Sequence, residues 1–140
     1  MTLFKTLQIV GLLGAFMFAD GCLRAPRCPE PSDMQSEHLY GHWLVQVAGE
    51  QRLWFLQLRP HPEYEMGLLG SIHNGSRSLQ VEANLNDGEL GLHENLYDKK
   101  ILAIWTGKVD AGSCGNTLTG QRQSGYNKFA TFVMHRHQGL

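Results

Sequence analysis

The sequence lacks an excess of charge of either sign. Its 140 residues include 12 Lys and Arg against 13 Asp and Glu, which leaves a formal net charge of −1. Nucleic-acid-binding proteins usually carry a broad basic face, so this balance argues against a nucleic-acid partner. With 42% hydrophobic and 18% charged residues, the composition is that of a globular protein and not of a disordered one. The length suits one domain and not two.

The sequence also lacks the catalytic and metal-binding sets that can be recognised by spacing. No serine lies in a Gly-x-Ser-x-Gly motif, and Cys114 has no base that the sequence defines. Among the seven histidines, His135 and His137 would share one strand face, but a zinc site needs three or four ligands. We therefore expect no enzymatic activity, no cofactor and no metal.

The apolar run near the start, from Leu7 to Ala19, is too short to cross a membrane. It covers about 13 residues, whereas a spanning helix needs roughly 20. One cation, Lys5, precedes the run and small residues follow it, the order typical of a secretory signal. We predict a signal peptide over residues 1–21, a tether with a short helix over 22–38 and a β-barrel domain over 39–140. A membrane-spanning helix is the alternative that the length disfavours.

The end of the signal resembles the bacterial lipoprotein signal, in which a small residue precedes a cysteine that becomes lipidated and N-terminal. Gly21-Cys22 matches this pattern, whereas Ala19 stands where Leu is usual and Asp20 departs from it. The resemblance implies a lipid anchor at Cys22, and Leu23 implies sorting to the outer membrane. Ordinary cleavage near Ala19, which would leave a periplasmic protein, is the alternative.

Cysteines are few and odd in number: Cys22, Cys28 and Cys114. An odd count in an exported chain leaves one cysteine to be explained. If Cys22 carries lipid, Cys28 and Cys114 can pair in an oxidising compartment. Closing so long a loop would stabilise the fold by about 4–5 kcal/mol on the chain-entropy argument. A Cys22–Cys28 bridge with Cys114 free is the alternative.

Glycine, by contrast, is plentiful, and the 16 glycines fall between short apolar runs, which favours strands and turns over long helices. In the stretch Leu39–Val47, the side chains of Trp43, Val45 and Val47 would share one face of a strand. Asn74-Gly75 predicts a hairpin turn in which both residues have positive φ. We predict eight strands, at about residues 43–47, 53–58, 64–72, 79–85, 90–92, 100–106, 117–122 and 128–135.

The segment ahead of these strands is rich in proline, with Pro26, Pro29 and Pro31, and is therefore predicted to be an extended linker. Ser32 would then cap a short helix that ends near Leu39. A long sheet in so small a chain does best by closing on itself, because closure removes exposed edges. The predicted fold is all-β, an eight-stranded antiparallel up-and-down barrel whose inward apolar side chains fill a small interior. A two-sheet sandwich is the alternative.

An eight-strand meander that opens with Gly41-His42-Trp43 and has Arg136 at the far end of its last strand resembles the calycins. These are the lipocalins, the avidins and the bacterial metalloprotease inhibitors. In this group the tryptophan commonly packs at the closed end of the barrel near a late Arg or Lys. The resemblance covers about residues 39–136 and implies a barrel signature of Gly41, Trp43 and Arg136.

The small exported inhibitors are the calycins closest in size, and they insert an N-terminal segment into the protease cleft. The corresponding stretch here is Leu23 to Pro31, although that family usually carries its disulfide within the barrel. The resemblance implies a non-enzymatic cell-envelope lipoprotein that binds a protein partner, such as a protease. The alternative is a carrier of small hydrophobic ligands, of lipocalin or avidin type. In a carrier, Trp43, Trp54 and Trp105 would line the pocket, whereas plain core packing is their alternative role.

Overall fold

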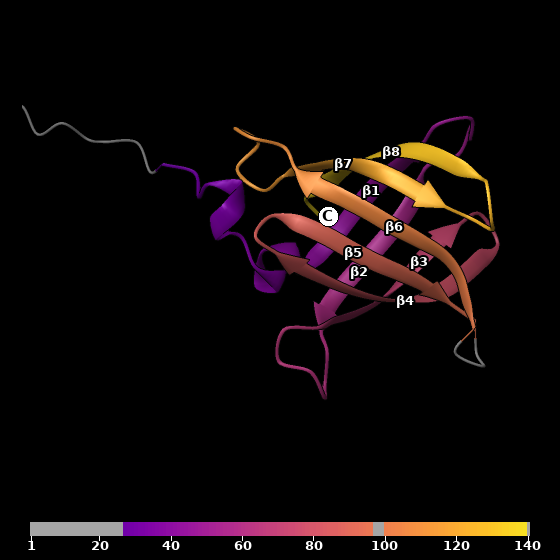
Figure 1. The fold of residues 1–140 in the computed structure, drawn as a ribbon, viewed down its shortest axis with the longest axis horizontal. Helices are drawn as coiled ribbons and strands as arrows, with labels where there is room; N and C mark the ends of the chain where they lie inside the picture. The colour runs from indigo at the N-terminus through magenta and orange to yellow at the C-terminus, as the bar shows by residue number, and fades with distance from the viewer. Residues whose placement is uncertain (1–26, 97–99, 140) are drawn as a thin grey trace, which may run out of the picture.

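Eight antiparallel strands close into a barrel, in which each strand pairs with its neighbours in sequence and β1 pairs with β8 (Figure 1). The structure, a computed structural model, describes residues 27–96 and 100–139. The predicted signal peptide and Cys22 lie outside the described residues. The all-β up-and-down barrel is confirmed, and the sandwich alternative is wrong. The strands are β1 (Gly41–Val47), β2 (Trp54–Pro60), β3 (Leu68–Asn74), β4 (Arg77–Asn86), β5 (Glu89–Asn95), β6 (Ile101–Val109), β7 (Thr117–Gln123) and β8 (Phe129–His137).

The up-and-down order gives the barrel two different ends. At the end that we call the lead-in end, two 3-10 turns, η1 (Pro31–Asp33) and η2 (Ser36–Leu39), precede β1 (Figure 1). The connections 61–67, 87–88 and 110–116 lie at this end too. At the opposite end, which we call the rim end, lie the connections 48–53, 75–76 and 124–128, and the described ends, Leu96 and Lys100, of the connection between β5 and β6. No helix in the described part of the chain is long and apolar enough to span a membrane.

Inward side chains fill the barrel. Buried and exposed residues alternate along the strands, as in β4, where the side chains from Leu79 to Leu85 are buried at every second position. At the centre, the ring of Trp105 lies 5.0 Å from that of Phe132 and 6.0 Å from that of Trp54, measured between centroids. Inward-facing Gly120 makes room for Phe132, because a Cβ there would lie 2.9 Å from Cε1 of that ring. The interior is thus a packed core.

The predicted capped helix over residues 32–39 is wrong in detail. The chain forms the two short turns instead, with Met34 extended between them. Ser32 lies inside the first turn, whose N-cap is Glu30 and has no side-chain capping hydrogen bond. Gln35 and His38 cap the second turn reciprocally. Met34 and Leu39 are each 1% exposed, so burial of these two side chains against the barrel outweighs the local preference for one continuous helix.

Two turn predictions also need correction. The third strand begins at Leu68 and not near Tyr64, because residues 61–67 form a loop closed by the bond from His61 N to Gly67 O (3.0 Å). At the β3–β4 hairpin the turn residues are Gly75 and Ser76, since Asn74 stays paired in β3. A two-residue hairpin connection in which both residues have positive φ lies instead between β4 and β5, at Asp87 (51°) and Gly88 (75°).

Candidate functional sites at the two ends of the barrel

Trp43 seals the lead-in end of the barrel. Its side chain is fully buried, and its indole N–H donates a hydrogen bond to the carbonyl oxygen of Leu39 (2.9 Å). The guanidinium of Arg136 lies over the indole, 4.4 Å from the ring centroid, a distance that allows a cation–π interaction. Gly41, with φ at 118°, lets the chain enter β1 beside this arginine. The structure therefore brings Gly41, Trp43 and Arg136 together.

Arg136 also ties residues 27–40, the segment ahead of β1 that we call the lead-in, to the last strand. Its guanidinium donates to the carbonyl oxygens of Tyr40 (2.9 Å) and His38 and to Oδ1 of Asn116 (3.1 Å). Burial lowers the pKa of Arg136 from its ordinary value, because a partly buried cation loses water. The three acceptors and the indole face replace that water. These contacts make Arg136 a structural anchor for η2.

A disulfide holds the start of the described chain against the β6–β7 loop. Cys28 and Cys114 are bonded, with Cα atoms 4.8 Å apart and a sequence separation of 86. Ser36 anchors the next segment, since its hydroxyl accepts from Leu85 N (3.0 Å) and donates to Met66 O (2.6 Å). Residues 27–30 are exposed. The lead-in is thus fixed by the disulfide and by Ser36, while its first described residues are exposed.

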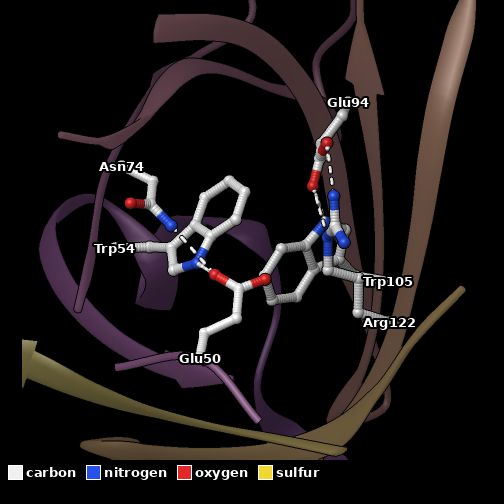
Figure 2. A network of polar contacts seen from close by, with 6 residues as sticks. All are labelled: Glu50, Trp54, Asn74, Glu94, Trp105 and Arg122. Carbon is white, nitrogen blue, oxygen red and sulfur yellow. Dashed lines mark hydrogen bonds and ion pairs between the residues drawn. The ribbon is translucent and has the colours of Figure 1, made fainter. Parts of the chain in front are cut away.

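A buried ion pair occupies the barrel near the rim end (Figure 2). Glu94 is 0% exposed. Its Oε1 accepts hydrogen bonds from Nε of Arg122 (2.7 Å) and from the indole N–H of Trp105 (2.8 Å), and its Oε2 accepts from Nη2 of Arg122 (3.0 Å). The bidentate geometry is the strong form of an arginine–carboxylate contact. It satisfies the carboxylate in a place that water does not reach.

Two tryptophans flank this arginine. The guanidinium carbon of Arg122 lies 5.1 Å from the ring centroid of Trp54 and 5.3 Å from that of Trp105. The indole N–H of Trp54 in turn donates to Oε2 of Glu50 (2.6 Å), which also accepts from Nδ2 of Asn74 (2.9 Å), as Figure 2 shows. Glu50 therefore links the β1–β2 loop to the end of β3 and to the aromatic core.

The buried polar groups of the rim-end network are all hydrogen-bonded. Every buried side-chain nitrogen and oxygen among the described residues has a hydrogen-bond partner. The three tryptophans that the carrier interpretation placed at a pocket are 0%, 3% and 2% exposed, in the order Trp43, Trp54 and Trp105.

Surface hollows are lined mainly by outward side chains. One, of about 350 Å³, lies over β5, β6 and β7 and is lined by residues such as Thr106, Lys108 and Gln121.

Histidines gather on the outer face but do not form a metal cluster. His42, His73 and His137 border a hollow of about 110 Å³ beside Phe55. His135 lies two residues before His137 on β8, and its Nδ1 is 3.2 Å from the hydroxyl oxygen of Thr117. Within residues 27–96 and 100–139, no group of three or more His, Cys, Asp or Glu side chains is placed to hold a metal ion.

The sequence prediction missed Glu94 and Arg122, although a signal for both was present. Glu94 falls in step with the inward residues Leu90 and Leu92, and Arg122 falls in step with Leu118. Two opposite charges that each occupy an apolar strand face predict a buried ion pair, because a lone buried charge is too costly. The part played by Glu50 depends on the loop conformation and has no comparable signal.

Comparisons with known proteins identify no relative of this chain. No protein-family model matches the chain, and a search of curated proteins finds no match. The barrel itself is compatible with a calycin-like fold.

Proposed function

We propose that the protein is a non-enzymatic, lipid-anchored binding module of the cell envelope that engages a protein partner with its lead-in end. The packed interior is the observation that carries this proposal. A barrel whose axis is filled by rings and by a satisfied ion pair leaves its loops and lead-in for binding, since the described interior is a packed core. A protease is the first partner to test, because the calycin-like inhibitors use the segment ahead of the barrel.

The lead-in supports this role through its rigidity. Arg27, Pro29 and Glu30 are exposed beside Cys28, whose disulfide holds them against the barrel. A segment fixed in one conformation loses less entropy when it binds than a free chain does. The carrier alternative has less support because its three candidate tryptophans are packed in the core. Unchanged tryptophan fluorescence across a panel of hydrophobic ligands would argue further against a carrier.

The test compares two forms of the protein with a panel of secreted proteases, metalloproteases included. One form starts at residue 23, so it carries no lipid but keeps every described element. The other starts at Cys28 and keeps the disulfide. We expect the longer form to inhibit one member of the panel and the shorter form to be at least about tenfold weaker, as for loss of a binding hot spot. Absence of inhibition by both forms would remove the protease from the proposal.

A matched control separates the lead-in from the rest of the surface. Ser78→Ala changes an exposed residue of β4 near the rim end and should leave inhibition unchanged. The anchor is tested separately by the intact mass of the protein purified from membranes. Diacylglycerol and an acyl chain on Cys22 would support the envelope localisation, at the outer membrane, whereas an unmodified chain cleaved near Ala19 would indicate a periplasmic protein.

A further inference from the structure

The connections at the rim end are basic. Each carries or adjoins one exposed cation, and the four are Arg52, Arg77, Lys100 and Lys128. Glu50 is the acidic residue described in these connections, and its carboxylate is engaged by Trp54 and Asn74.

The connections at the lead-in end are acidic. Outside the strands, the described segments there carry one arginine, Arg27, and seven carboxylates: Glu30, Asp33, Glu37, Glu63, Glu65, Asp87 and Asp110. Although the net charge of the chain is close to zero, the connections at the two ends of the barrel thus carry charges of opposite sign. Arg52, Arg77 and Lys128 are also free of ion pairs with described acidic side chains.

Large apolar side chains protrude among the rim-end cations. Tyr126 is 89% exposed, Phe129 59%, Ile101 49% and Leu53 43%. They belong to three of the four connections or to the strand residues beside them. Neither the fold nor the core explains their exposure, since the inward positions are already filled.

We propose that the rim end is a docking surface for an anionic lipid bilayer. Lys and Arg at this end would contact the lipid phosphates, and Leu53, Ile101, Tyr126 and Phe129 would enter the boundary between headgroups and acyl chains. The site lies at the end of the barrel opposite to the proposed partner site, and it does not depend on that proposal.

The distribution of the apolar side chains favours a bilayer over a folded protein partner. A protein interface has a contiguous apolar core with a polar rim. Here the apolar side chains stand on separate connections, interleaved with cations. A fluid lipid surface can accommodate such scattered side chains, because headgroups fill the space between them.

The experiment measures partition of the form that starts at residue 23 into vesicles, by co-sedimentation at low salt. One set of vesicles contains phosphatidylglycerol and phosphatidylcholine, and the other contains phosphatidylcholine alone. We expect binding to the first set, weaker binding as salt rises, and little binding to the second. The double variant Arg52→Gln/Lys128→Gln should bind about 25-fold more weakly, at about fivefold for each cation removed.

A matched control carries the same change of charge at the other end. Arg27→Gln/Arg59→Gln removes two exposed cations of the lead-in half of the barrel and should stay within about twofold of the wild type. Tyr126→Ser/Phe129→Ser should weaken binding about tenfold while the charge is unchanged. Near-ultraviolet circular dichroism checks that each variant keeps its fold.

Three results would overturn the proposal. The first is equal partition of the wild type into the two vesicle types. The second is an equal loss in both charge variants, which would reflect overall charge and not the rim. The third is binding that does not change in Tyr126→Ser/Phe129→Ser and is matched by a single-stranded oligonucleotide, which would make the rim a site for soluble polyanions.

Discussion

Removal of one partner of the buried ion pair is predicted to destabilise the barrel strongly. Arg122→Met leaves the carboxylate of Glu94, which is fully buried, with the indole N–H of Trp105 as its remaining donor. The side chain of Arg122 is 11% exposed and that of Glu94 is 0% exposed, so water cannot replace the lost cation. Breaking a pair at this depth costs about 3–5 kcal/mol of the free energy of unfolding.

A double variant tests whether the uncompensated charge of Glu94 causes this loss of stability. In Glu94→Gln/Arg122→Met no charge is left in the barrel, and the glutamine oxygen can still accept the hydrogen bond from Trp105. Replacing both partners of a buried pair often costs little. We therefore expect the double variant to be more stable than Arg122→Met alone, with a coupling free energy of at least about 1.5 kcal/mol.

Urea unfolding followed by tryptophan fluorescence measures these differences, since Trp54 and Trp105 flank the altered site. A loss of this size should lower Tm by about 10 °C or more in a domain of about this length. If Arg122→Met costs less than about 1 kcal/mol, the pair is not functioning as a buried one. If the double variant is less stable than Arg122→Met, the uncompensated charge of Glu94 is not the cause of the loss.

Three further predictions test the lead-in and the strand packing. Cys28→Ser/Cys114→Ser should lower the unfolding free energy by about 2–5 kcal/mol in urea, and a reducing agent should lower that of the wild type but not of the variant. Arg136→Lys keeps the charge but loses the fork that binds two carbonyl oxygens, so it should cost about 1–3 kcal/mol in thermal unfolding; no change would mean that the fork does not hold η2. Gly120→Ala places a Cβ 2.0 Å from a backbone oxygen, whereas the Cβ of Gly125→Ala meets nothing within 4 Å. The first variant should therefore lose about 3 kcal/mol or more of unfolding free energy, and the second about 1–2 kcal/mol. Equal losses in the two variants would contradict the packing argument.

The closed barrel could be predicted from two local patterns in the sequence, the alternation of apolar residues and the positions of the turns. Trp43, Val45 and Val47 alternate with less buried residues, and each such alternation reports which face of a strand is buried. Glycine-bearing turns then fix where the strands reverse. The pairing of β1 with β8 is not local, yet it is the way for eight short strands to leave no open edge. For this reason fold class was the most predictable property.

The errors arose where tertiary contacts override local preference. Tyr64 and Met66 continue the alternation of β3, but they are 64% and 55% exposed in the loop before it. The pattern alone cannot show that the ladder with β2 ends where Pro60 pairs with Leu68. Similarly, Asn74-Gly75 has the right composition for a turn with two positive φ values. Asn74 is instead held in β3, with its side chain bonded to Glu50.

The connections at the two ends of the filled barrel are held in place by different contacts. The axis of the barrel is occupied by packed side chains, and the fold fixes the connections at its two ends by different means. A disulfide and Arg136 hold the lead-in. At the rim, Glu50 joins the β1–β2 loop to β3 and to the ring of Trp54, and through that ring to Arg122. The buried ion pair is thus in contact, through the ring of Trp54, with the residues that join the β1–β2 loop to β3.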